Sequence, residues 1–173
     1  MIMKQAIIHI GLSNPKSPLN VASVMRAAGN YRVDRVVYTG ERYPRALQRN
    51  PTIPKLSRKV SKDIPLAQVE CLIAAADRLP IVCVELAENA IALPEYQHPQ
   101  NALYIFGPED GTLEQGIIDR ADAVVYIPTV GCMNLAATVN VLLYDRLAKS
   151  RQAIDHNELI RQSRDTNNTV KLR

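Results

Sequence analysis

The sequence predicts an α/β fold in which a parallel sheet carries helices on both of its faces. Short apolar runs, rich in β-branched and aromatic residues, alternate along the 173 residues with stretches of helical periodicity. Several of these runs end at glycine or proline, which is typical of buried strands followed by turns. No apolar run approaches the roughly 20 residues of a membrane span, so we expect no membrane partner.

Composition favours one domain with an ordinary core. Hydrophobic residues make up 47% of the chain and charged residues 22%, as in typical globular proteins. We expect the domain to occupy residues 1–150, followed by a basic, partly disordered tail over residues 151–173. Cys71, Cys83 and Cys132 are odd in number and lack CxxC spacing, which indicates neither a disulfide framework nor a zinc site. A reducing, cytoplasmic location fits this pattern.

The first predicted elements are a strand at Ala6–Ile10 and a helix at Leu19–Asn30. Ser17 is the expected N-cap of this helix, and Pro18 takes its first position. Apolar residues fill one arc of the helix, and the opposite arc, which includes Ala27, is mainly polar. Its polar row, at spacings of three, is Asn20, Ser23 and Arg26.

The middle of the chain predicts two strands and a helix. Arg35–Tyr38 and Ile81–Leu86 have strand composition, and Leu66–Leu79 places apolar residues at helical spacing. Asn89–Gln100 is expected to be a connection with about one helical turn.

Residues 101–149 contain the clearest pattern in the chain. Leu103–Phe106 and Val124–Ile127 predict buried strands, with a helix over Leu113–Arg120 capped by Thr112 between them. Glycine-bearing turns follow both strands. Because parallel strands place their carboxyl ends at one edge, these turns should meet where open α/β sheets bind ligands.

The last long helix, Leu135–Lys149, has no wide polar face. Such a helix should be buried, either within the subunit or against a second subunit. In the tail, His156–Gln162 can form a helical turn, and Asp165–Thr169 has the composition of a disordered segment.

A basic segment lies between Glu41 and Pro65. It holds seven Lys or Arg against two Asp or Glu, a net charge of +5, while the whole chain carries +4. Four prolines and no clear period predict an exposed loop of irregular pieces. Such a loop can contact nucleic-acid phosphates, and it can equally be a solvated surface.

Several familiar sites are absent. The sequence contains no Walker A motif, no GxSxG elbow and no GxGxxG after the first strand. His9, His98 and His156 have no carboxylate or cysteine partner at metal or triad spacing, so we expect no metal. Cys132 follows a glycine turn, where a packing or binding role is more probable than nucleophilic chemistry.

Three segments, in order and spacing, resemble the three motifs of the SpoU branch (TrmH-like) of the SPOUT superfamily. These segments are NVASVMRAAGNYRV, LYIFGPEDGTL with ADAVVYIP, and GCMNLAATVNVLLYD. Family members are S-adenosylmethionine-dependent RNA 2′-O-ribose methyltransferases. The resemblance implies a Rossmann-like SPOUT fold with a C-terminal trefoil knot, a homodimer, and tRNA or rRNA as substrate.

The resemblance also assigns residues. Asn20 and Arg26 match the first motif, Glu109 the second and Asn134 the third, and these four are the expected catalytic residues. The family has serine where this chain has Cys132, and a second small polar residue where it has Ala136, so neither position offers a hydroxyl.

Cofactor and RNA contacts follow from the same resemblance. S-adenosylmethionine, which leaves as S-adenosylhomocysteine, is held in the family largely by backbone groups of the loops after the last three strands. The matching residues here are Leu86, Gly107, Ile127, Pro128, Cys132 and Met133. In the basic segment, the expected RNA contacts are Arg42, Arg45, Arg58 and Lys59.

Methyl transfer to a ribose requires a group that stabilises the negative charge developing on the attacking 2′-hydroxyl oxygen. A guanidinium with a pKa above about 12 is a poor base, so Arg26 is expected to hold a phosphate and stabilise the developing alkoxide. Two other readings stay open: a non-catalytic RNA-binding module that keeps the fold, and a generic phosphate-binding α/β enzyme that uses the Gly107–Gly111 turn. Binding of S-adenosylmethionine would separate both from the methyltransferase.

Overall fold

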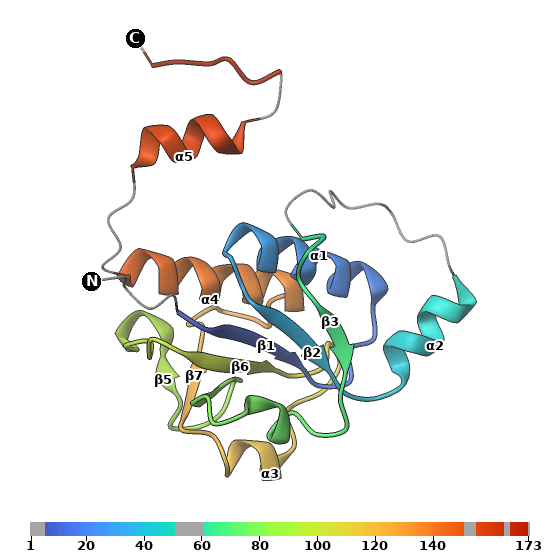
Figure 1. Cartoon of the computed structure of the whole chain (residues 1–173). Helices are drawn as coiled ribbons and strands as arrows, with labels where there is room; N and C mark the ends of the chain where they lie inside the picture. The colour runs from blue at the N-terminus through green and yellow to red at the C-terminus, as the bar shows by residue number, and fades with distance from the viewer. Residues whose placement is uncertain (1–5, 51–60, 151–154, 165–166, 173) are drawn as a thin grey trace.

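A computed structural model describes residues 6–50, 61–150, 155–164 and 167–172. In this part of the chain, seven strands form one sheet in the order β3-β2-β1-β6-β4-β7-β5, and every pairing is parallel (Figure 1). The predicted parallel α/β sheet is therefore confirmed. The strands are β1 Ile8–Leu12, β2 Arg35–Tyr38, β3 Leu66–Gln68, β4 Ile81–Val84, β5 Ile91–Ala92, β6 Ala102–Phe106 and β7 Ala123–Tyr126.

Helices cover both faces of the sheet, but unequally. Helices α1 (Pro18–Asn30) and α4 (Leu135–Lys149) pack on one face, where Ile10 and Tyr104 point. The other face, which Ile105 joins, is covered by short turns: η1 (Ala74–Ala76) and α3 (Gln115–Ile118). Alternation of side chains along each strand produces these two apolar layers. Figure 1 shows the long helices and α3 on opposite sides of the sheet.

Helix α1 begins as the sequence predicts. The Ser17 side chain accepts a hydrogen bond from the Asn20 backbone N–H at 3.4 Å, and Pro18 occupies the first turn. Arg26 is exposed, in agreement with its polar position. Ala27 is the exception: it is buried, because it packs in the same apolar cluster as Ala28.

The predicted helix over Leu66–Leu79 is wrong. Residues 66–68 form edge strand β3 beside β2, and only Ala74–Ala76 are helical. Backbone bonds flank this pairing, from the Val36 N–H to the Pro65 carbonyl at 3.0 Å and from the Val69 N–H to the Tyr38 carbonyl at 2.8 Å. Sheet pairing therefore overrides the helical spacing of the apolar side chains, which pack as turns against the second face.

The basic segment is partly helical, which corrects the expectation of an irregular loop. Arg42–Arg49 form α2. Pro44 fits because it is the third residue of the helix, where backbone N–H groups lack helical acceptors. Tyr43 is buried and meets Tyr38 edge-on, with ring centroids 5.1 Å apart, so α2 is anchored to the sheet. Arg58 and Lys59 lie outside the described residues.

Helix α3 and the connection after β4 also differ from prediction. Helix α3 is shorter than Leu113–Arg120, and its N-cap is Glu114 rather than Thr112, because the backbone of Glu114 is extended. Just before it, the Leu113 N–H donates to the Glu85 carboxylate at 2.8 Å. The connection after β4 contains the expected helical turn, η2 (Leu93–Glu95), and also the short strand β5, which the sequence pattern missed.

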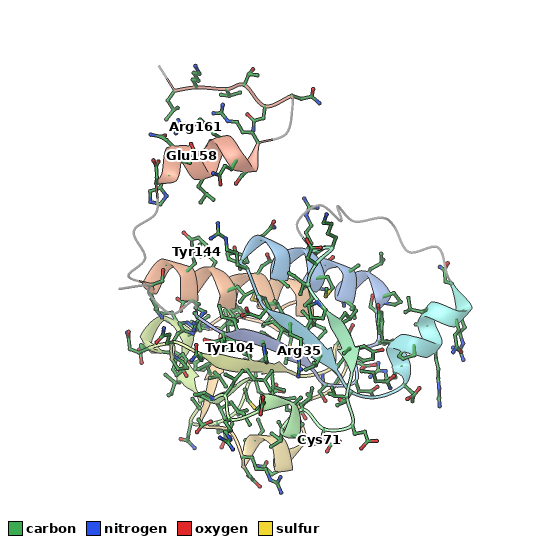
Figure 2. All side chains as sticks on the ribbon, viewed as in Figure 1. Arg35, Cys71, Tyr104, Tyr144, Glu158 and Arg161 are labelled. Carbon is green, nitrogen blue, oxygen red and sulfur yellow. The ribbon has the colours of Figure 1, made fainter. Side chains whose placement is uncertain are left out.

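Helix α4 has the predicted bounds but only one buried face. Leu142 is wholly buried within the subunit, whereas Val141, Tyr144 and Leu147 are exposed. Figure 2 shows Tyr144 on the side of α4 away from the sheet. In the tail, α5 (His156–Ser163) confirms the helical turn and extends it, and all of its residues are exposed. The trefoil knot and the domain boundary at residue 150 stay predictions.

No helix in the described part of the chain is long and apolar enough to cross a membrane.

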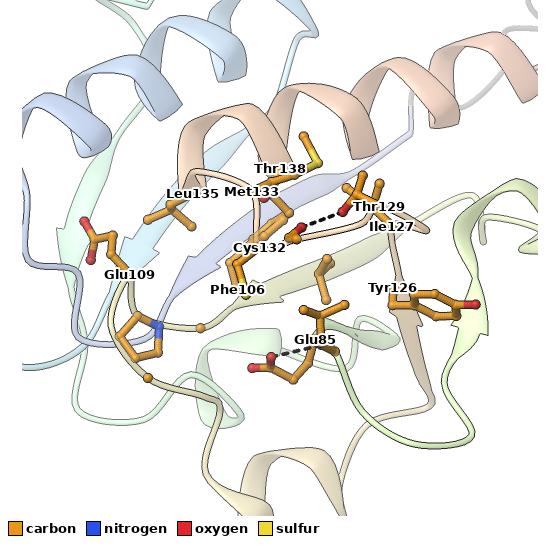
Figure 3. A pocket seen from close by; sticks show the side chains of 16 residues that line it. Glu85, Phe106, Glu109, Tyr126, Ile127, Thr129, Cys132, Met133, Leu135 and Thr138 are labelled. Atoms are coloured by element: carbon orange, nitrogen blue, oxygen red, sulfur yellow. Dashed lines mark hydrogen bonds between the residues drawn. The ribbon is translucent and has the colours of Figure 1, made fainter.

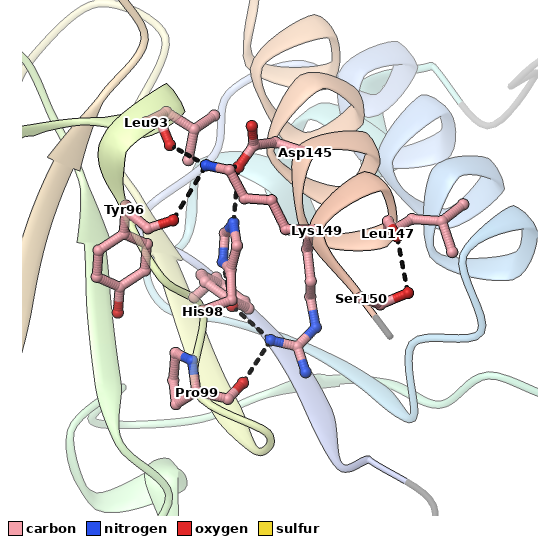
Figure 4. A network of polar contacts seen from close by, with 10 residues as sticks. Leu93, Tyr96, His98, Pro99, Asp145, Leu147, Lys149 and Ser150 are labelled. Atoms are coloured by element: carbon pink, nitrogen blue, oxygen red, sulfur yellow. Dashed lines mark hydrogen bonds and ion pairs between the residues drawn. The ribbon is translucent and has the colours of Figure 1, made fainter. Parts of the chain in front are cut away.

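A polar network fastens the carboxyl half of α4 to the segment before β6 (Figure 4). His98 bridges the Tyr104 hydroxyl at 2.8 Å and the Asp145 carboxylate at 2.9 Å. Because the Asp145 carboxylate only accepts, His98 Nε2–H donates to it, and in the neutral imidazole Nδ1 accepts the Tyr104 hydroxyl proton; the hydroxyl oxygen also accepts from Arg146 at 2.8 Å. Lys149 completes the network, with Nζ bound to Asp145 at 2.7 Å and to the Tyr96 carbonyl at 3.0 Å.

We expect this network to make the free energy of unfolding fall as the pH drops below about 6.5, the usual pKa of histidine. Burial lowers the pKa of His98 below its usual 6.5, although the Asp145 hydrogen bond opposes this, and Arg146 and Lys149 lower it further. A base whose folded pKa is depressed stabilises the fold when neutral, and this stability is lost as pH falls through about 6.5. Urea unfolding at a series of pH values should therefore show that the free energy of unfolding falls more steeply with decreasing pH for the native chain than for His98→Gln.

The pKa of His9 is also lowered by burial, so His9→Gln is a parallel test of the same effect outside the network. Both histidines should contribute to the loss of stability at acid pH. Equal pH slopes for the native chain and His98→Gln would show that the network tolerates the protonated imidazole.

Candidate functional site

The site lies at the carboxyl edge of the sheet, where neighbouring strands β1 and β6 send the chain to opposite faces. Residues 13–17 lead from β1 to α1 on one face, and residues 107–114 lead from β6 to α3 on the other. A crevice between two such diverging loops is the usual ligand site of open α/β sheets. The predicted position of the site is therefore the one that the fold provides.

Three of the four expected catalytic residues meet in this crevice. The Asn20 Nδ2 group donates to Glu109 Oε1 at 3.0 Å, and Asn134 Nδ2 donates to Asn20 Oδ1 at 3.0 Å. Asn134 is also the N-cap of α4, since its Oδ1 accepts the Ala136 N–H at 2.9 Å. Residues from three distant segments thus form one chain of hydrogen bonds, which we call the Glu109–Asn20–Asn134 chain.

The chemistry of the partners fixes the direction of this chain. A carboxylate only accepts, so Asn20 must turn its amide nitrogen to Glu109 and its oxygen to Asn134. The backbone donor at Ala136 requires the Asn134 oxygen in the same way. Each amide keeps one N–H outside the chain, available to a ligand in the crevice.

Glu109 is held as an anion. Burial raises the pKa of its carboxyl, but hydrogen bonds from the Asn20 amide and from backbone N–H groups outweigh burial and lower the pKa overall. Those backbone donors are Lys16, at 2.8 Å, and Ser17, at 2.9 Å. A carboxylate with three donors is a weak base, so its role here is to hold the start of α1 in place.

Arg26, the fourth residue, is not part of the chain. It lies six residues beyond Asn20 in α1, which is about 9 Å along the helix axis. Its side chain is exposed. The structure therefore places one exposed cation apart from the Glu109–Asn20–Asn134 chain.

Beside the chain lies a pocket of about 150 Å³ (Figure 3). The loops after β4, β6 and β7 and the start of α4 line it. Five of the six expected cofactor residues are among the lining residues: Leu86, Gly107, Ile127, Cys132 and Met133. Pro128, the sixth, does not line the pocket although its two neighbours do. Glu109 is also in the wall, so the pocket and the polar chain share one residue.

Glu85 is a lining residue that sequence reasoning did not assign. One of its oxygens accepts the Leu86 N–H at 3.0 Å, and the other accepts the Leu113 N–H at 2.8 Å. A Cβ added to Gly107 would lie 3.0 Å from the second oxygen, so any larger residue here would press on this carboxylate. Glu85 thus joins the loops after β4 and β6. An acidic residue directly after a buried strand was the available signal.

The third wall of the pocket is the loop after β7. The Thr129 hydroxyl donates to the Gly131 carbonyl at 2.8 Å and closes a tight turn before Cys132. Cys132 is exposed and lies in the pocket wall, which agrees with a binding role. Cys83, by contrast, is buried in β4, and burial raises the pKa of its thiol to about 12.

The two expected RNA contacts that lie in the described residues, Arg42 and Arg45, have different surroundings. Arg42 does not point freely into solvent: it binds Asp110 with one nitrogen at 2.7 and 2.8 Å from the two oxygens. Arg45, also in α2, is exposed. No group of three or more possible metal ligands occurs among residues 6–50, 61–150, 155–164 and 167–172.

Comparison with known proteins connects this site to one family. The model of the SpoU rRNA Methylase family matches residues 7–144. The tRNA (cytidine-2′-O-)-methyltransferase TrmJ of Methanocaldococcus jannaschii is 28% identical, over 83% of this chain and 68% of that protein.

Solved structures agree in fold. The SpoU methyltransferase AviRb from Streptomyces viridochromogenes, in complex with AdoMet, superposes with a TM-score of 0.67 and 17% identity. That match covers 85% of this chain and 59% of AviRb, so the chain spans less than two thirds of that protein. The A. aeolicus TrmH/SpoU tRNA modifying enzyme gives a TM-score of 0.66 at 15% identity, covering 84% of this chain and 76% of the enzyme. A further structure gives insights into the 2-OH methylation of C/U34 on tRNA. It superposes with a TM-score of 0.68 at 21% identity, and the match covers 86% of this chain and 93% of that chain.

The polar chain makes a prediction about stability. Glu109→Gln keeps one acceptor oxygen but loses the charge that binds three donors, so we expect the free energy of unfolding to fall by about 1–2 kcal/mol. The loss should shrink below pH 4.5, because a carboxyl whose pKa is lowered by folding contributes stability above its unfolded pKa. Urea titrations at pH 7 and pH 4 would measure both effects.

Glu114→Gln is the matched control, because the Glu114 side chain makes no capping bond to α3. Its effect should stay within about 0.5 kcal/mol. An equal effect for both variants would mean that the Glu109 bonds add nothing to the fold.

Proposed function

The chain belongs to the SpoU rRNA methylase family, and from this membership we propose that it is an RNA methyltransferase. The reaction is transfer of a methyl group from S-adenosylmethionine to a ribose 2′-hydroxyl. The observation that carries the proposal is the Glu109–Asn20–Asn134 chain, which meets the wall of a pocket at Glu109. We propose tRNA as the substrate class, because the curated relative is a tRNA 2′-O-methyltransferase.

The pocket suits a cationic nucleoside such as S-adenosylmethionine. Apolar side chains of Phe106, Ile127 and Leu135 offer a surface for a flat base. The carboxylates of Glu85 and Glu109, in the same wall, suit hydroxyl or ammonium groups. When bound, the cofactor supplies an electrophilic methyl group.

The side chains of this protein then position the ribose and stabilise charge. Asn20 and Asn134 each have one amide N–H to offer to a ribose oxygen, and their orientation is fixed before RNA binds. Such preorganised donors lower the cost of a developing negative charge. Arg26 is proposed to hold a phosphate and to stabilise the alkoxide, since its exposed side chain is free to move toward bound RNA. Neither Arg26 nor Glu109 is suited to remove the proton as a strong base, so the hydroxyl proton passes to solvent water as the methyl group leaves the sulfonium sulfur.

Activity has a direct test. Purified protein should bind S-adenosylmethionine by calorimetry and transfer labelled methyl groups to unmodified tRNA transcripts. Nucleoside mass spectrometry should then find 2′-O-methyl ribose. Absence of cofactor binding would favour a module that only binds RNA, and transfer to rRNA alone would change the substrate class.

We also propose a homodimer. Val141, Tyr144 and Leu147 form a ridge on α4 at spacings of three residues, with exposures of 36%, 62% and 37%. A second copy of the chain would remove this apolar ridge from water, which is the usual reason that such faces associate.

Replacing Arg26 tests the catalytic proposal. Arg26→Ala should slow single-turnover methyl transfer by about 10²–10³-fold, the scale of losing one preorganised donor. Stability should change by no more than about 0.5 kcal/mol, because the side chain is exposed. Arg26→Lys should restore only part of the rate, since an ammonium lacks the planar fork of a guanidinium.

Cofactor binding is the control for this variant. Calorimetry should give the same affinity as the native protein, because Arg26 does not line the pocket. Native transfer rates in Arg26→Ala would remove this residue from the mechanism, and weakened cofactor binding would assign it a structural role.

If two copies associate through the ridge, charged residues placed on it should disrupt the dimer. Tyr144→Glu combined with Val141→Arg should convert a dimer to a monomer at micromolar concentration, measured by light scattering. Leu159→Glu on α5 is the control, because Leu159 is similarly exposed, at 39%, and lies outside the ridge. A native chain that is already monomeric at that concentration would contradict the proposal.

A further inference from the structure

Two cations from different elements converge on one carboxylate at the rim of the site. Asp110 is bound by Arg42, at 2.7 and 2.8 Å, and by Lys16 Nζ, at 3.3 Å. Lys16 belongs to the loop before α1, and Arg42 is the first residue of α2. All three side chains are solvent-accessible, with exposures of 62% for Lys16, 32% for Arg42 and 49% for Asp110.

This ion cluster is adjacent to the Glu109–Asn20–Asn134 chain. Asp110 directly follows Glu109, and the Glu109 carboxylate accepts the backbone N–H of Lys16 at 2.8 Å. Consecutive carboxylates therefore have different tasks: Glu109 binds the backbone before α1, and Asp110 binds the two side-chain cations. In RNA, a phosphate is attached on each side of every ribose. A ribose placed at the chain brings a phosphate close to Lys16 and Arg42.

We propose that Lys16 and Arg42 bind a backbone phosphate of the substrate RNA, and that Asp110 occupies these cations until the phosphate displaces it. The inference rests on the proposed function and adds to it the anchor beside the reacting ribose and a built-in competitor. Arg42 binds both oxygens of the Asp110 carboxylate through one guanidinium nitrogen, and a guanidinium also binds the two free oxygens of a phosphodiester.

The exchange is energetically easy because the pairs are exposed. Ion pairs in contact with water contribute little and are screened by salt, so Asp110 does not trap the two cations. The hydrogen bond from Arg42 lowers the pKa of the Asp110 carboxyl, although slight burial opposes it, so Asp110 is an anion at neutral pH. It therefore competes under the conditions in which RNA binds.

Removing the competitor should improve binding, which distinguishes this role from an ordinary structural one. Asp110→Asn is expected to tighten binding of an unmodified tRNA transcript by about 3–10-fold at 0.1 M salt. Arg42→Gln and Lys16→Gln should weaken it, and each should reduce the log–log salt slope by about 0.7–0.9, the value for one phosphate contact. Fluorescence anisotropy would measure these affinities.

Glu41→Gln is the matched control for the lost negative charge. Glu41 precedes Arg42, but its carboxylate accepts from the Gln68 amide at 2.8 Å instead of a cation. It should leave the affinity nearly unchanged. The gain from Asp110→Asn should also disappear in a chain that carries Lys16→Gln and Arg42→Gln, because no freed cation remains. Thermal melting would confirm that each variant is folded.

The outcomes separate this inference from the proposed function. If the native protein binds S-adenosylmethionine and methylates tRNA, but Asp110→Asn gives no gain, the inference fails alone. A gain that persists without Lys16 and Arg42, or that Glu41→Gln reproduces, also overturns it. If methyl transfer is absent while Asp110→Asn tightens binding of polyuridylate through the two cations, the phosphate site stands and the methyltransferase proposal fails.

Discussion

The carboxylate of Glu109 is the interaction on which the arrangement of this site depends. It binds the backbone at Lys16 and Ser17 and the side chain of Asn20, and thus fixes the start of α1 against the loop after β6. Asn20 in turn positions Asn134, the cap of α4. One anion therefore sets the relative position of two parallel helices and the loop that borders the pocket.

Much of this could be predicted because the signals were local. Strand β2 and helix α4 have the predicted bounds, since turn residues and a capping residue mark their ends in the sequence. Asn20, Glu109 and Asn134 were expected together from their motifs, and hydrogen bonds join them. Five of the six residues expected to hold the cofactor line one pocket, because parallel strands bring their loops to one edge.

The errors come from contacts between segments that are distant in sequence. Residues 66–68 form a strand only because β2 offers an unpaired edge, and their own pattern is helical. The Glu85 carboxylate binds the N–H of Leu113, 28 residues away and just before α3, and no local pattern in the sequence indicates this contact. Likewise, the sequence shows that Arg42 is a cation, but it cannot show that Arg42 forms an ion pair with Asp110. A single sequence shows which residue types are present, but not which of them pair with one another in the fold.

The position of α4 at the end of the sheet domain has a consequence for synthesis on the ribosome. The polar chain needs Asn134, and the pocket wall extends to Thr138. Strands β1, β2 and β6 leave the ribosome before α4, because synthesis begins at the amino terminus. The growing chain has no complete pocket until α4 has left the exit tunnel and docked. A chain paused before residue 134 therefore has no competent ligand site.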